Sequence, residues 1–183
     1  MKTAIFLADG FEEIEGLTVV DVLRRAKIVC DMISTEDDLE INGSHGIKVK
    51  ADYMISDINF EEYDCMILPG GKIGTQRLEA NQYLLKRLDE FIKANKLVCA
   101  ICAAPSILAH KGYLNDKEAV CYPTVEGELA GANIPAKEVA HDGNIITSRG
   151  MGTSIAFAGE IVKTILDEET ADGLLKSLVY KQF

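Results

Sequence analysis

Short runs of apolar residues recur along the chain, separated by stretches with helical periodicity. The most continuous runs are residues 3–8 (TAIFLA), 64–68 (DCMIL) and 97–101 (LVCAI). Such runs are typical of strands that are buried on both faces of a parallel sheet. Less regular runs predict further strands at residues 27–34, 119–122, 138–140 and 144–148. Residues 39–50 turn at Asn42-Gly43 and predict a small antiparallel hairpin.

Apolar residues at helical spacing lie between these runs. They predict helices at residues 13–26, 80–94, 104–111, 153–166 and 168–178. Alternating strands and helices favour an α/β fold with a mostly parallel central sheet covered on both faces. Ligands bind such sheets at the carboxyl ends of the strands. We therefore expect the functional site in the loops that follow strands, at residues 9–15, 69–75, 102–105, 122–126 and 148–153.

Composition narrows the choice of partners. The 183 residues carry 19 Lys and Arg against 29 Asp and Glu, a formal net charge of −10. A chain of this size can fold as one domain, here residues 1–183, without a disulfide or metal. The acidic balance predicts neither nucleic acid nor an anionic membrane surface as a partner. The opening MKTAIFLADG has no signal-peptide pattern, and no run is long enough to span a membrane, so we expect a cytoplasmic protein.

The five cysteines, an odd number, fit a reducing compartment. Cys30, Cys65 and Cys99 fall within predicted strands, where a thiol packs as a small apolar side chain. Cys99 and Cys102 form a C-x-x-C spacing, but a strand separates such a pair by roughly 10 Å, too far for a disulfide. No second pair completes a zinc site, so we predict no metal. The role of Cys121 stays open.

Cys102 ends the most apolar strand, within LVCAICAAPS (97–106). Small residues follow it, and Pro105 suits the first turn of a helix. This is the layout of a nucleophile elbow with cysteine in place of serine. The helix start predicts a stabilised thiolate, and free N–H groups such as that of Ala103 for an oxyanion. On this motif alone, one more buried thiol remains the alternative.

Three other strand ends carry candidate chemistry. Gly70 and Gly71 close the segment LPGG, and glycine N–H groups can approach a ligand closely. Arg149 lies in SRGMGTS (148–154). Glu15 follows the first strand, and in an apolar pocket it would be protonated and could donate to a thiolate. The glycines fit neither a phosphate loop nor a dinucleotide fingerprint, so we predict no cofactor.

Together these motifs match a known family over nearly the whole chain. They are a glycine followed by E-E-x-E (Gly10, Glu12, Glu13, Glu15), VVDVLRRA (19–26), LPGG (68–71), AICAAP (100–105) and TSRGMGTS (147–154). The chain resembles the ThiJ/PfpI superfamily, and within it the branch of parkinsonism-associated protein deglycases and YajL-like proteins. The resemblance implies a flavodoxin-like three-layer α/β sandwich, similar to class I glutamine amidotransferases.

The resemblance also implies roles for individual residues. Cys102 is then the reactive cysteine, and Glu15 is the protonated acid that is hydrogen-bonded to it. The N–H groups of Gly71 and Ala103 line an oxyanion site, in a pocket that also includes Gly70, Tyr122 and Arg149. A homodimer through the first helix is implied, with Ile14 and Leu17 at the interface and Arg25 crossing to the partner.

Two positions depart from the family pattern. Tyr122, in CYPT, stands where the branch has a histidine near the cysteine, and a phenol is a poor base at neutral pH. Ser44-His45 replaces a Ser-Arg pair in the hairpin, which in the family dimer lies near the partner's site. His45 is therefore a candidate to supply an imidazole across the dimer, although an exposed turn histidine is the simpler interpretation.

Two functions use the same thiol. The first is a cofactor-independent hydrolase of the glyoxalase or deglycase type, acting on methylglyoxal-like α-oxo-aldehydes or their early adducts, with Cys102 as nucleophile and Glu15 as proton shuttle. The alternative is a protein that senses or protects against oxidative stress, in which Cys102 is oxidised to sulfinic acid. A protease ranks lower, because Ala103 replaces the histidine that follows the cysteine in the PfpI branch. A chaperone ranks lower for want of an apolar stripe.

Overall fold

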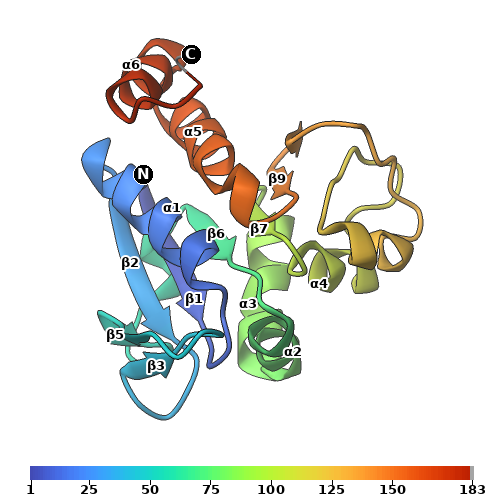
Figure 1. Cartoon of the computed structure of the whole chain (residues 1–183). Helices are drawn as coiled ribbons and strands as arrows, with labels where there is room; N and C mark the ends of the chain where they lie inside the picture. Colours follow the sequence, from blue (N-terminus) through green and yellow to red (C-terminus); the bar gives the residue numbers. More distant parts are fainter. Residues whose placement is uncertain (182–183) are drawn as a thin grey trace.

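The computed structural model describes residues 1–181 and is built around one central sheet (Figure 1). The strand order is β5-β2-β1-β6-β7-β9-β8, and all neighbours are parallel except the antiparallel pair β8 and β9. The strands are β1 (Lys2–Leu7), β2 (Val29–Ser34), β5 (Tyr53–Met54), β6 (Cys65–Leu68), β7 (Leu97–Ile101), β8 (Val139–Asp142) and β9 (Ile145–Ser148). The predicted hairpin is confirmed as a separate ribbon of β3 (Glu40–Asn42) and β4 (Lys48–Lys50).

Helices cover both faces of the sheet. One face packs against α1 (Glu13–Arg25) and α5 (Ser154–Ile165), with α6 (Glu168–Ser177) lying on α5. The other packs against α2 (Lys72–Ala80), α3 (Gln82–Lys93) and α4 (Pro105–His110). Short 3₁₀ turns are η1 (Phe60–Glu62), η2 (Pro123–Glu128) and η3 (Met151–Thr153). The predicted three-layer α/β sandwich with a mostly parallel sheet is confirmed.

Strand β1 shows why the buried strands read as continuous apolar runs. Ala4 and Phe6 pack into the core on the α3 side of the sheet, whereas Ile5 and Leu7 pack into the core on the α1 side. All four are at most 1% exposed. Because successive side chains of a strand point to opposite faces, a sheet covered on both faces needs apolar residues at every position.

Some elements differ from the prediction. Helix α2 falls where a loop was expected, and the two-residue strand β5 was not predicted. Residues 119–122 were predicted as a strand, but they form none. Their N–H groups are satisfied in other ways, since Ala119 donates to the carbonyl of Asn133 (3.0 Å) and Val120 to the hydroxyl of Thr147 (2.9 Å).

The cysteines in the strands are core residues, as predicted. Cys30, Cys65 and Cys99 are free thiols at most 2% exposed. The Sγ atoms of Cys65 and Cys99 lie 3.8 Å apart on neighbouring strands, where the two free thiols share a hydrogen bond and form no disulfide. Cys121 is also fully buried, on the other side of the sheet.

The carboxyl ends of β1, β6, β7 and β9 meet at one edge of the sheet, and the loops that follow them converge there (Figure 1). These loops lead into α1, α2, α4 and α5. Among the described residues, no helix is both long and apolar enough to cross a membrane.

Candidate active site

Cys102 occupies a tight turn between β7 and α4. Its φ is +66°, a left-handed conformation that is uncommon for a residue other than glycine. Hydrogen bonds on both sides hold it there: its N–H donates to the carbonyl of Ser148 (3.0 Å), and its carbonyl accepts from the N–H of Tyr122 (2.8 Å). Pro105 is the first residue of α4. The structure therefore has the geometry of the predicted nucleophile elbow.

Glu15 lies beneath this turn. It projects from α1, is fully buried, and accepts a hydrogen bond on Oε2 from the N–H of Gly70 (3.0 Å). Gly70 separates the carboxyl from Cys102 so closely that a Cβ there would overlap Oε2 of Glu15 and lie 2.5 Å from Cβ of Cys102. Only glycine lets these three groups meet. Among the described residues, Oε1 of Glu15 has no hydrogen-bond partner.

Burial governs the ionisation of this pair. It raises the pKa of Glu15 to about 7, and the negative charge of Glu12 adds to the effect. The pKa of Cys102 is raised to about 12 by burial first and then by the charge of Glu15. The N–H group of Ala103 at the helix start lowers the pKa of Cys102, as expected, but burial and the charge of Glu15 outweigh it, so the net shift of this pKa is upward and the expected low-pKa thiol is not found. When Glu15 is protonated, its negative charge no longer raises the pKa of Cys102. The ionisation of each group therefore depends on that of the other, and the thiol and the carboxyl titrate as a pair.

Two backbone N–H groups, those of Gly71 and Ala103, donate to the sulfur of Cys102 and lower its pKa. They are the two donors predicted from the sequence. Gly71 has a φ of +92°, and a Cβ there would lie 2.7 Å from the nitrogen of Glu12, so no other residue fits. Donors fixed in this way stabilise a negative oxygen that forms next to the sulfur.

A cavity of about 600 Å³ opens above the sulfur. Its apolar wall comes from Tyr122, Val125 and Met151. The rest of its lining comes from the loops that follow β1, β6 and β7, from α2, from the start of α4 and from η2. It consists of Glu12, Gly71, Lys72, Thr75, Gln76, Glu79, Cys102, Ala103, Ser106, Thr124 and Glu128. Lys72, Thr75, Thr124 and Val125 fall within the loops 69–75 and 122–126 that the sequence indicated, whereas Gln76, Glu79 and Glu128 lie beyond them and were not predicted. A polar helix that follows directly on a Gly-Gly turn is the one signal in the sequence that pointed to α2.

Of the other residues predicted in the pocket, one lines the cavity and two do not. Tyr122 lines the cavity, and its ring lies over Gly150, where a Cβ would be 3.2 Å from Cδ2 of the tyrosine. Gly70 was predicted in the pocket but is not among the lining residues, and its N–H donates to Glu15. Arg149 was also predicted in the pocket and is not among the lining residues. Instead its guanidinium pairs with Glu126 of η2 (2.9 Å). The pairing turns the cation away and ties the η2 segment to the end of β9.

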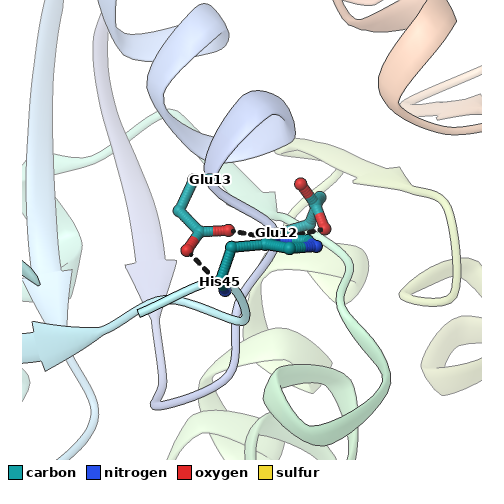
Figure 2. A group of neighbouring side chains, drawn as sticks. All are labelled: Glu12, Glu13 and His45. Atoms are coloured by element: carbon teal, nitrogen blue, oxygen red, sulfur yellow. Dashed lines mark hydrogen bonds and ion pairs between the residues drawn. The ribbon is translucent and has the colours of Figure 1, made fainter. Parts of the chain in front are cut away.

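His45 contacts the start of α1 in its own chain (Figure 2). Its ring Nδ1 lies 3.0 Å from Oε2 of Glu13 and 3.6 Å from Oε2 of Glu12. The backbone N–H of His45 donates to Oε1 of Glu13 (2.7 Å). The ring is 68% exposed. Because Glu12 also lines the cavity, the hairpin reaches the edge of the site within the same chain.

The same three side chains are the one set of described residues with metal-ligand spacing, each offering an atom within 4.8 Å of the others. However, the hydroxyl of Ser44 lies between them, 3.0 Å from Glu12, 2.9 Å from Glu13 and 2.9 Å from Nδ1 of His45. Hydrogen bonds thus account for the arrangement without an ion.

These hydrogen bonds make Glu13 a source of pH-dependent stability. Burial by itself raises the pKa of Glu13, but hydrogen bonds from His45 and Ser44 outweigh it and lower the pKa to about 2. A carboxyl whose pKa is lower in the folded state than in the unfolded state stabilises the fold at pH values above its unfolded-state pKa. This stability is lost as the pH falls toward its folded-state pKa. We expect Glu13→Gln to lower the free energy of unfolding by about 2 kcal/mol at pH 6, measured by urea denaturation. The difference should shrink between pH 4.5 and 2. A difference that is constant over this range would contradict the ionic contribution.

Known proteins share the sequence pattern of this chain over most of its length. The model of the DJ-1/PfpI family matches residues 1–164. The Drosophila melanogaster protein dj-1beta is 30% identical over 177 residues, 96% of this chain and 95% of that protein. DJ-1 homolog B of Arabidopsis thaliana is 34% identical over 172 residues, but the chain spans only 39% of its length.

The fold comparison gives the same result. The structure of oxidized DJ-1 from Toxoplasma gondii superposes with a TM-score of 0.93 at 32% identity, covering 98% of both chains. The crystal structure of Drosophila DJ-1beta gives a TM-score of 0.92 at 31% identity and covers 97% of each chain. With both the sequence pattern and the architecture in agreement, the chain belongs to the DJ-1/PfpI family.

Proposed function

We propose that this protein is a cofactor-independent hydrolase of the glyoxalase or deglycase type, which converts methylglyoxal-like α-oxo-aldehydes or their early adducts to hydroxy acids. The observation that carries the proposal is the meeting of one thiol, one buried carboxyl of pKa about 7 and two N–H donors at the base of a cavity. A nucleophile, a proton shuttle and an oxyanion site are the groups this chemistry needs.

In the first step the thiolate of Cys102 adds to the aldehyde carbon. The carbonyl electron pair moves to oxygen, where the N–H groups of Gly71 and Ala103 stabilise it and the proton of Glu15 completes a hemithioacetal. The carboxylate of Glu15 then takes the proton from this carbon and delivers it to the neighbouring carbonyl carbon, while the hydroxyl proton passes from the first oxygen to the second. The product is a thioester of a 2-hydroxy acid.

Water then attacks the thioester and displaces the thiolate, which restores the enzyme. The sum is one aldehyde and one water giving one hydroxy acid, so no redox partner is consumed. Tyr122 lines the cavity where the branch has a histidine, so water activation lacks a neutral-pH base from this position and we expect a slow enzyme.

The test of this proposal is the formation of lactate from methylglyoxal by the purified protein. We expect a rate above that of buffer, and loss of this rate after Cys102 is blocked with iodoacetamide. The blocked protein is the control for trace metals and buffer catalysis. Lactate formation no faster than buffer would contradict the proposal.

A second candidate function, oxidation sensing, is favoured by the exposure of the thiols. Cys102 is 7% exposed, whereas the other four cysteines are at most 2% exposed. The donors around Cys102 suit sulfinate oxygens as well as an oxyanion. We expect mild peroxide to add two oxygens selectively to Cys102, as measured by mass spectrometry of peptides. Equal oxidation of all five cysteines would refute this function.

The proposal includes a cytoplasmic homodimer formed through α1. Ile14 projects from this helix and is 54% exposed, and Leu17 beside it is half-buried. An apolar strip of this kind favours a helix-to-helix contact. In a single chain Arg25 pairs with Asp21 of the same helix (2.7 Å), so a contact across the dimer would have to share or exchange this partner.

A further inference from the structure

The cavity above Cys102 differs in charge between its base and its outer wall. At the base, N–H groups of Gly71 and Ala103 point at the sulfur, and α2, with nine residues, begins directly after Gly71. Free N–H groups and the positive end of a helix favour negative charge there. The outer wall contains Glu79 and Glu128, whose side chains are 35% and 53% exposed.

One imidazole joins these two outer carboxylates. His110 ends α4, and its Nδ1 lies 2.6 Å from Glu79 of α2, while its Nε2 lies 3.4 Å from Glu128 of η2. A histidine carries at most one positive charge. The pair of carboxylates therefore keeps an excess of negative charge whichever protonation state His110 takes.

The rest of the lining does not cancel this excess. Glu12 is a third carboxylate in the wall, and Lys72 is the one cation among the lining residues. Arg149 does not supply a second cation, because it forms an ion pair with Glu126 and neither residue lines the cavity. The overall charge of the chain, −10, has the same sign.

We propose that Glu79 and Glu128 make the cavity selective for carbonyl compounds that bear a cationic group at the end remote from the carbonyl, and select against anionic ones such as α-oxo acids. The carbonyl oxygen is held at the base by N–H groups, and the other end meets carboxylates. Charges that line a cleft change encounter rates by about 10-fold or more, and salt screens the effect. The inference deepens the proposed function and rests on the reactivity of Cys102.

The test uses thiol reagents of similar size and opposite charge. Trimethylammonium-ethyl and sulfonato-ethyl methanethiosulfonate both react by attack of the thiolate on the sulfenyl sulfur, forming a disulfide and releasing methanesulfinate. The rates are normalised to those with a free small thiol, and mass spectrometry confirms Cys102 as the site. At low salt we expect the cationic reagent to react about 10-fold faster or more than the anionic one. In the double variant Glu79→Gln, Glu128→Gln, or in about 1 M salt, this ratio should fall several-fold.

The matched control is the double variant Glu160→Gln, Glu168→Gln. These carboxylates lie on α5 and α6, pair with His141 and Lys163, and do not line the cavity. The control changes the net charge equally and should keep the wild-type ratio. Equal rates for both reagents, or the same loss in both double variants, would overturn the inference. Because the reagents need no turnover, a missing lactate activity with an intact charge ratio counts against the proposed function alone.

Discussion

Replacing Cys102 with serine should reduce the conversion of methylglyoxal to the buffer rate, a loss of at least about 1,000-fold relative to any wild-type activity. The hydroxyl fits the same turn, since the left-handed conformation of Cys102 and the hydrogen bonds of its backbone to Ser148 and Tyr122 do not involve the sulfur. A hydroxyl does not ionise near neutral pH, and a pKa of about 7 for Glu15 makes this carboxyl too weak a base to activate it. The fold should therefore persist while the nucleophile is lost.

Cys30→Ala is the matched control for this variant. Cys30 is a buried thiol of β2 that packs beneath α1, away from the cavity lining. Its loss leaves a small void and should lower the free energy of unfolding by about 1 kcal/mol without changing lactate formation. If Cys102→Ser forms lactate at the wild-type rate, the nucleophile is another group and the proposed role of Cys102 is wrong.

Those parts of the fold that follow from local pattern were predictable. The buried strands β1 and β7 are continuous apolar runs because both faces of the sheet are covered. Helix α2 was missed because its burial depends on a tertiary contact: a Cβ at Gly74 would lie only 2.7 Å from Cα of Phe11 in the β1–α1 loop. Residues 119–122 have the composition of a strand, but their N–H groups bond to Asn133 and Thr147 rather than to a ladder.

The base of the site was predictable for a topological reason. The carboxyl ends of parallel strands lie at the same edge of the sheet. Glu15, Gly70, Gly71 and Cys102, which follow such strand ends, therefore lie together although they are far apart in sequence. The outer wall was not predictable, because Glu79 and Glu128 lie near the far ends of α2 and η2, beyond the loops 69–75 and 122–126 that the sequence indicated. The predicted direction of the pKa shift of Cys102 was also wrong. Burial raises this pKa, and burial depends on the folded site rather than on a sequence motif.

The shared proton of Glu15 and Cys102 leads to the second large effect. In the wild type the first proton leaves the pair near pH 7, and the single negative charge is then distributed between carboxylate and thiolate. The rate of alkylation of Cys102 by iodoacetamide should therefore rise through pH 7 and level off. A further rise belongs to the second proton, whose loss the charge of Glu15 delays toward pH 12. Glu15→Gln should remove the inflection near pH 7 and leave a single rise at higher pH, because burial still opposes ionisation of the thiol.

Glu12→Gln separates this coupling from a general change of charge. The charge of Glu12 raises the pKa of Glu15, so its removal should keep the two-step alkylation profile and move the first inflection to lower pH. Loss of the proton shuttle in Glu15→Gln should also slow lactate formation by about 100-fold or more, whereas Glu12→Gln should not cause such a loss. If Glu15→Gln keeps the inflection near pH 7, the titrating group is not Glu15, and the carboxyl has no part in activating the thiol.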